Sequence, residues 1–192
     1  MRPAYVESDR KQPELVNGQV KVHPMVKNYM KAMGDSGMMS ALFPYEHGGQ
    51  QLPSLVGGAA YFILGSAHNS FTMFSSLTSG SAHLITSFGT DELIEKFSKR
   101  MLTGEWTGTM CLTEPGAGSS LSDVITSATP QADGSYKIKG QKVFISAGDH
   151  DIADNIVHLV LARIDGAPLG TKGISLFVVP KFRADEAGTY TV

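Results

Sequence analysis

The sequence predicts an α+β fold in which an N-terminal all-α domain, residues 1–107, precedes an antiparallel β domain, residues 108–192. Up to Gly104 the apolar residues recur with the 3.6-residue period of helices, and beyond it they alternate as in strands. Asp133-Gly134 lies between two β-rich runs, which is a signal for a hairpin. The 192 residues are 42% hydrophobic and 18% charged, values typical of a globular chain with a sizeable core.

Composition excludes several classes of function. A net charge of −2 and a pI of about 6.3 argue against nucleic-acid binding, which needs a basic face. No run of 18 apolar residues occurs, so no membrane span is expected. The single cysteine, Cys111, precludes an internal disulfide and fits a reducing, cytoplasmic compartment. It lacks a basic neighbour, and we interpret it as a small buried side chain and not as a catalytic thiol.

The N-terminal third contains one predicted helix. Residues up to Gly18 are polar and broken by prolines, so we expect a loose lead-in. Pro24 suits the first turn of a helix, and apolar side chains at helical spacing continue to Gly34. The methionines of this helix, continued by Met38 and Met39, are interpreted as core, with a soft acyl-binding wall as the alternative.

Two apolar helices follow, the first from Ser54 to Gly65 and the second from Asn69 or Ser70 to Phe88. The expected buried face of the second consists of Phe71, Phe74, Leu77, His83, Leu84 and Ile85. Its histidines lack the spacing of a metal pair and are interpreted as packing or capping groups.

A short helix capped by Thr90 and ended by Gly104 completes the helical half. Beyond it, strands are expected at residues 124–129, 136–139, 142–147, 156–164 and 174–179.

One acidic loop separates two of these strands and contains Asp149, His150, Asp151 and Asp154. It lacks an EF-hand pattern and a spaced histidine partner. We interpret it as a solvated loop and assign no metal ligands.

The stretch from Met110 to Ser120, MCLTEPGAGSS, carries the strongest chemical signal. An apolar run breaks at a Glu-Pro pair and continues as glycines and serines. Glycines let the backbone approach a phosphate closely, and serine hydroxyls add uncharged donors. By itself this pattern is equally typical of an ordinary turn.

Further motifs give the stretch its context: LTEPGAGS (112–119), GQKVFISAG (140–148), PYEHGG (44–49), GTDE (89–92) and LTGE (102–105). In order and spacing they resemble the acyl-CoA dehydrogenase family, and the first two resemble its flavin segments. The likeness runs from about Pro44 to Pro180. It departs from the family at Ser120, where relatives usually carry Asp.

The resemblance implies an antiparallel β-barrel-like middle domain, a C-terminal helical domain that is missing from this chain, and FAD as cofactor. It implies that Met110, Leu112 and Thr113 line the isoalloxazine ring, Gly118 and Ser119 reach the diphosphate, Phe144 and Ile145 follow against the ring, and Ser146 hydrogen-bonds near its reactive nitrogen. Relatives often carry Trp at position 144 and Thr at position 146. Alone, Phe144 and Ile145 would be interpreted as strand core.

The reaction implied is the α,β-dehydrogenation of an acyl-CoA thioester to a trans-2-enoyl-CoA, with an electron-transfer protein as acceptor and a homo-oligomer as the full-length form. The family's catalytic base lies in the C-terminal helical domain, so no catalytic residue is assigned here. Glu114 is expected to order its turn. Residues 145–181 further resemble the branch that contains 3-(methylthio)propanoyl-CoA dehydrogenases.

Two other readings stay open. One is an enzyme of the same fold with different chemistry, an acyl-CoA oxidase or a nitroalkane-oxidising flavoprotein. The other is a non-catalytic flavin- or acyl-binding fragment.

Overall fold

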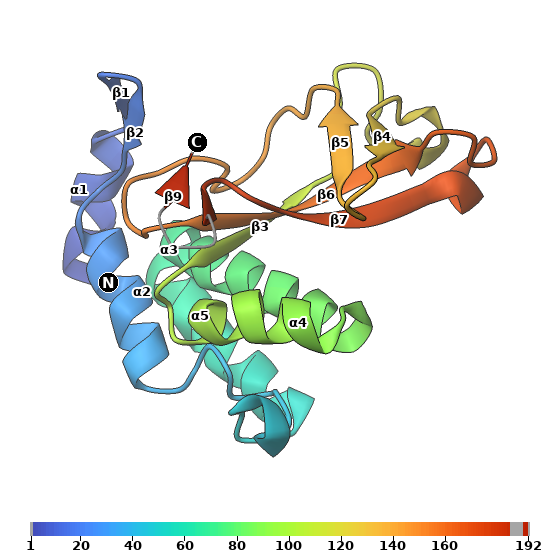
Figure 1. The fold of residues 1–192 in the computed structure, drawn as a ribbon. Coiled ribbons are helices and arrows are strands. Elements are labelled where there is room, and N and C mark those ends of the chain that lie inside the picture. The colour runs from blue at the N-terminus through green and yellow to red at the C-terminus, as the bar shows by residue number, and fades with distance from the viewer. Residues whose placement is uncertain (1, 185–189, 192) are drawn as a thin grey trace.

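A layer of helices covers one face of a mixed β-sheet in this computed structural model, which describes residues 2–184 and 190–191 (Figure 1). The α-helices are α1 (Tyr5–Arg10), α2 (Met25–Asp35), α3 (Ser54–Phe88), α4 (Asp91–Leu93) and α5 (Lys99–Leu102). Short turns of helix are η1 (Arg2–Ala4), η2 (Tyr45–His47), η3 (Ile94–Ser98, a π-helical turn), η4 (Leu121–Asp123) and η5 (Thr171–Gly173). The predicted change from helix to strand near Gly104 is confirmed, while the division into domains at residue 107 remains a prediction.

The strands are β1 (Glu14–Val16), β2 (Gln19–Lys21), β3 (Thr107–Cys111), β4 (Ser127–Pro130), β5 (Tyr136–Lys139), β6 (Ile156–Ile164), β7 (Ile174–Pro180), β8 (Arg183–Ala184) and β9 (Tyr190–Thr191). In the main sheet β6 pairs in parallel with β3 and with β4, and antiparallel with β7. The predicted hairpin at Asp133-Gly134 is confirmed as β4–β5.

The expectation of an antiparallel, barrel-like sheet is corrected by this topology, because the described sheet is mixed. The cause is the connection over residues 112–155. It carries the β4–β5 hairpin and crosses back before β6 begins, so β6 runs in the same direction as β3.

The expected loose lead-in is also wrong. Residues 14–21 form the β1–β2 hairpin, whose turn places Asn17 and Gly18 in the left-handed region at φ 50° and 77°. An Asn-Gly pair between two strands favours this turn because both residues tolerate positive φ. The signal was present in the sequence but is short and surrounded by polar residues.

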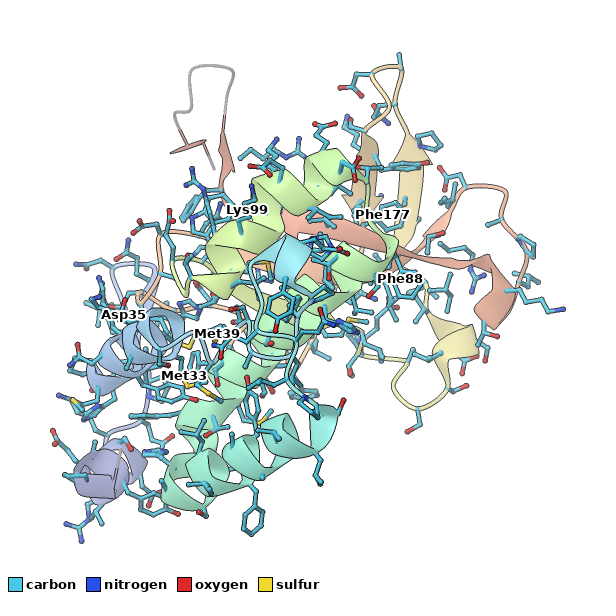
Figure 2. All side chains as sticks on the ribbon, turned by 90° about the horizontal axis from the view of Figure 1, so that it is seen from below. Met33, Asp35, Met39, Phe88, Lys99 and Phe177 are labelled. Carbon is cyan, nitrogen blue, oxygen red and sulfur yellow. The ribbon has the colours of Figure 1, made fainter. Side chains whose placement is uncertain are left out.

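Helix α3 consists of two limbs that meet at His68, where φ and ψ are −167° and 92° (Figure 2). The prediction of two successive helices is therefore confirmed. The His68 ring stacks on Phe71 at 3.7 Å and hydrogen-bonds with Ser8 at 2.7 Å. His83, expected on the buried face of the second limb, is exposed and lies edge-on to the ring of Phe43.

Two apolar clusters hold the layers together. One joins α2 to α3 and contains the buried side chains of Met30, Met33 and Met39, which supports their interpretation as core. Met33 and Met39 are labelled in Figure 2. The other joins the helices to the sheet and includes Phe43, Ala82, Ile85, Phe97, Met101, Leu102, Trp106, Val157 and Leu159. Within residues 2–184 and 190–191, no helix is both long and apolar enough to cross a membrane.

The close contact between α2 and the turn after α5 gives a test of this packing. A Cβ added at Gly34 would lie 1.9 Å from the carbonyl oxygen of Thr103, which cannot move as a flexible side chain would. Gly34→Ala is therefore expected to destabilise the chain by about 1–3 kcal/mol, although alanine is the better helix former.

Gly58→Ala is the matched control, because a Cβ there meets nothing within 4 Å. It should be neutral or stabilising by up to about 1 kcal/mol. Denaturant unfolding of both variants measures the difference, and equal effects would contradict the packing described.

Candidate functional site

The first candidate segment begins on β3, which lies against the helical layer. Gly108 packs so closely on α3 and α5 that a Cβ there would lie 2.5 Å from the nearest side chain. Met110, two residues on and on the same face, is half-buried against the same core. On the opposite face the hydroxyl of Thr109 hydrogen-bonds with Nδ1 of His158 at 2.7 Å. Cys111 is buried beside them, and burial raises the pKa of its thiol, which fits a packing role.

After β3 the chain makes a tight turn. Leu112 and Thr113 are half-buried, and the backbones of Glu114 and Ala117 exchange hydrogen bonds of 2.7 and 3.2 Å. Beyond the turn, a Cβ at Gly118 would meet nothing within 4 Å, and Ser119 is exposed. The glycine–serine run thus has open space around its backbone at Gly118 and an exposed hydroxyl at Ser119.

The second segment is a loop, so the strand expected at residues 142–147 is wrong. Phe144 and Ala147 adopt left-handed φ values of 57° and 54°, which interrupt an extended chain. The Phe144 side chain is 94% exposed, Ile145 is half-buried and Ser146 is exposed. The strand-core alternative, which would apply to Phe144 if the segment stood alone, does not fit this exposure. An exposed aromatic ring at a disfavoured backbone angle is a feature that often accompanies a binding site.

The two segments meet at the end of β3. The amide of Val143 donates to the carbonyl oxygen of Thr113 at 2.9 Å, and the ammonium of Lys142 donates to the carbonyl oxygen of Leu112 at 3.1 Å. Phe144, the first ring-contact residue expected in the second segment, follows directly. Gly118 and Ser119 follow the turn formed by Glu114 and Ala117, on the other side of it from Thr113.

Glu114 is the buried centre of this meeting point. Its carboxylate accepts from Lys142 Nζ at 2.7 Å and from the amides of Ile125 and Thr126 at 2.8 and 3.1 Å. Burial alone would raise the pKa of Glu114, but these donors outweigh it and lower the pKa to about 2. The carboxylate is thus charged and fully engaged, which fits a role in ordering the turn. The roles of Lys142 and Thr126 were not found from sequence, where no pattern links them to Glu114.

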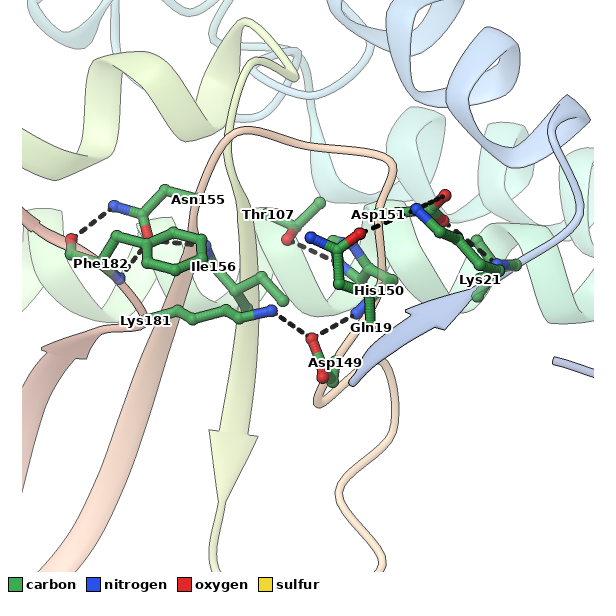
Figure 3. Close-up of polar contacts among 11 residues, drawn as sticks. Gln19, Lys21, Thr107, Asp149, His150, Asp151, Asn155, Ile156, Lys181 and Phe182 are labelled. Atoms are coloured by element: carbon green, nitrogen blue, oxygen red, sulfur yellow. Dashed lines mark hydrogen bonds and ion pairs between the residues drawn. The ribbon is translucent and has the colours of Figure 1, made fainter. Parts of the chain in front are cut away.

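A second set of contacts anchors the far end of the loop (Figure 3). Nε2 of His150 lies 2.9 Å from the hydroxyl of Thr107 at the start of β3, and Asp149 pairs with Lys181. His150 is buried, so the expectation of a wholly solvated loop is wrong at this residue. The loop therefore runs back along β3, from Thr113 at one end to Thr107 at the other.

The acidic neighbour Asp151 accepts from the amide of Val22 at 3.2 Å and pairs with Lys21 at 3.3 Å, which ties the loop to β2 (Figure 3). Among the described residues, no three His, Cys, Asp or Glu side chains gather in a form that could hold a metal ion.

The apolar side chains, hydroxyls and open backbone near the end of β3 suit an aromatic heterocycle that carries a diphosphate. Half-buried Met110 and Leu112 supply apolar contacts, and Phe144 supplies an exposed ring. Hydroxyls stand on both segments, at Thr113 and Ser146. The open backbone at Gly118 leaves room for an anion, which backbone N–H groups bind well.

Two family models together match most of this chain. Residues 109–190 match the family model "acyl-CoA dehydrogenase, middle domain", and residues 12–105 match "acyl-CoA dehydrogenase, N-terminal domain". The 3-methylmercaptopropionyl-CoA dehydrogenase of Ruegeria pomeroyi is 45% identical over 97% of this chain, which spans 32% of that protein.

Two solved structures share the fold. Butyryl-CoA dehydrogenase from Megasphaera elsdenii has a TM-score of 0.73 and 26% identity over 94% of this chain and 44% of its own. An acyl-CoA dehydrogenase complexed with FAD from Bacillus anthracis has a TM-score of 0.68 and 28% identity over 83% of this chain and 27% of its own.

The anchor at His150 predicts a pH dependence of stability. Burial is the main cause that lowers the pKa of His150 to about 4 from its ordinary 6.5. The unfolded chain takes up this proton near pH 6.5 and the folded chain only near pH 4. Stability that is fully present above pH 6.5 is thus lost as the pH falls to 4, by about 3 kcal/mol.

His150→Gln should make the free energy of unfolding less dependent on pH between 4 and 6.5. Thr107→Val removes the hydrogen-bond partner but keeps the imidazole, so most of the pH dependence should remain. Denaturant unfolding between pH 4 and 7.5 measures it. The assignment is wrong if the His150→Gln and parent profiles run parallel.

Proposed function

Because this chain belongs to the acyl-CoA dehydrogenase family, we propose that it forms the FAD site of an enzyme that converts an acyl-CoA thioester to a trans-2-enoyl-CoA. The observation that carries the proposal is the 2.9 Å hydrogen bond from Val143 to Thr113, which brings the two flavin-like segments together. The chain spans about a third of its curated relative, so the activity proposed is that of a longer protein.

The turn after β3 is proposed to hold the diphosphate. The amides of Gly118 and Ser119 and the Ser119 hydroxyl are neutral donors, which bind an anion without adding a competing charge. Only glycine leaves the backbone at position 118 free of a side chain, so a phosphate oxygen can approach closely.

The ring is proposed to lie between the end of β3 and the loop. Met110 and Leu112 give one apolar wall for the ring, and Phe144 and Ile145 on the other segment give further apolar contacts. The hydroxyls of Thr113 and Ser146 hydrogen-bond the polar edge of the ring and fix its orientation. When bound, the flavin supplies the hydride-accepting chemistry.

No catalytic base is assigned within these residues. Both oxygens of the Glu114 carboxylate are engaged by Lys142 and two backbone amides, and a pKa of about 2 makes this group too weak a base to take a proton from a substrate. The likeness to a 3-methylmercaptopropionyl-CoA dehydrogenase suggests a short, thioether-containing acyl group for the substrate. An electron-transfer protein as acceptor, a homo-oligomeric assembly and a cytoplasmic location are proposed with it.

The experiment that tests the function is a titration of FAD into the purified chain, followed by fluorescence and the visible spectrum. Acyl-CoA and an artificial electron acceptor are then added to the loaded protein. We expect flavin binding without turnover from these 192 residues, and turnover from a longer protein that contains them. Absence of FAD binding to either would overturn the proposal, and reoxidation by oxygen at the rate of turnover would favour the oxidase reading.

Gly118→Asp tests the diphosphate contact. It places a carboxylate where the anion is expected and should raise the Kd for FAD by at least about tenfold, or about 1.4 kcal/mol. Gly118→Asn has the same shape without the charge and should weaken binding less. Neither should alter the unfolding midpoint, since a Cβ at this position meets nothing within 4 Å. Unchanged FAD affinity in the Asp variant would remove Gly118 from the site.

Ser146→Ala tests the ring contact. The loss of one hydrogen bond, roughly 0.5–1.5 kcal/mol, should shift the spectrum or potential of the bound flavin while the fold survives, because this side chain is exposed. Ser146→Thr retains the hydroxyl and should behave as the parent. If the alanine variant has the parent's spectrum and potential, the hydroxyl does not contact the flavin.

A further inference from the structure

We propose that Glu114 and Lys142 are positioning residues, a buried ion pair that sets where Phe144, Ile145 and Ser146 stand relative to the end of β3. The inference rests on the proposed flavin site. It adds that an ion pair fixes the conformation of the loop in the ligand-free protein.

The pair is buried, and each member has further hydrogen-bond partners on the backbone. The side chains of Glu114 and Lys142 are 2% and 10% exposed, and their charged atoms lie 2.7 Å apart. Both carboxylate oxygens accept additional backbone amides, from Ile125 and Thr126. A buried pair with this many partners has one favoured geometry, because any displacement leaves a charge or an amide unsatisfied in a low-dielectric interior.

The pair also joins three separate pieces of chain. Glu114 belongs to the turn after β3, its backbone donors precede β4, and Lys142 lies in the second flavin segment, two residues before Phe144. Lys142 also donates to the carbonyl oxygen of Leu112 at 3.1 Å. One ammonium group therefore fixes the loop to both the backbone and the side chain of the first flavin segment.

Gly140 gives independent support for a fixed register. A Cβ at this position would lie 2.3 Å from the hydroxyl of Thr126, so the chain entering the loop packs directly on the residue before β4 whose amide donates to Glu114. The loop is thus held at Gly140 by close packing and at Lys142 by the ion pair with Glu114.

The residues that follow depend on this anchor. Phe144 is 94% exposed and Ser146 is exposed, so packing does little to hold these side chains. Their direction is set by the backbone, which turns left-handed at Phe144 immediately after the Val143–Thr113 hydrogen bond. A loop released at Lys142 would carry both side chains away from Met110.

The test compares Lys142→Met, Glu114→Gln, the double variant and the control Lys31→Met. Lys31 pairs with Asp35 on the exposed face of α2, so the control breaks an ion pair by the same substitution outside the proposed site. Three quantities are measured: the unfolding midpoint, the Kd and visible spectrum with FAD, and the amide hydrogen exchange of residues 141–148 without FAD.

Lys142→Met should raise the Kd for FAD by about tenfold or more, shift the bound-flavin spectrum and speed exchange in the loop, while the control matches the parent. In the double variant no buried charge is left unpaired, so the midpoint should recover toward that of the parent. The flavin spectrum and the loop exchange should not recover, because the tether is still absent.

If the Kd and spectrum of the double variant recover together with its midpoint, the pair is merely structural and the proposal is overturned. Amide exchange in the loop of Lys142→Met at the rate of the parent would also overturn it. If the parent binds no FAD, the proposed function fails by itself. The exchange data then decide whether the pair positions the loop.

Discussion

The buried carboxylate of Glu114 is the group on which the geometry of the candidate site depends. It accepts hydrogen bonds from one ammonium group and two backbone amides, which belong to segments distant in sequence. Since a buried charge is costly unless fully paired, these segments have to stay together for the charge to be tolerated. The turn, the start of β4 and the loop after Gly140 are therefore arranged around one side chain.

The helical layer gives this arrangement a rigid base. β3 is fixed against the helices by close packing at Gly108 and within the sheet by its parallel pairing with β6. The residues proposed to contact a ligand stand at its end, where the strand leaves the sheet. Apolar packing thus sets the position of the strand, and polar contacts set the loops around it.

Sequence reasoning reached most of what local pattern controls, although it missed the short β1–β2 hairpin. Helical periodicity found α2, the two limbs of α3 and the helix after Thr90, whose hydroxyl accepts from the amide of Leu93 as a cap. It failed where distant residues decide: the parallel pairing of β6 depends on a long crossover, and the loop at residues 142–147 contains a β-rich sequence that Lys142 and two left-handed residues hold out of the sheet. The burial of His150 likewise follows from its contact with Thr107, which no local pattern reveals.

The central claim is that Met110–Ser119 and Phe144–Ser146 form one flavin site. A crystal structure of the protein with FAD tests it most directly. The account predicts diphosphate oxygens within hydrogen-bond distance of the Gly118 and Ser119 amides, and the ring beside Met110 and Leu112 with the Ser146 hydroxyl at its edge. A flavin bound elsewhere on the chain, or one that contacts only one of the two segments, would contradict it.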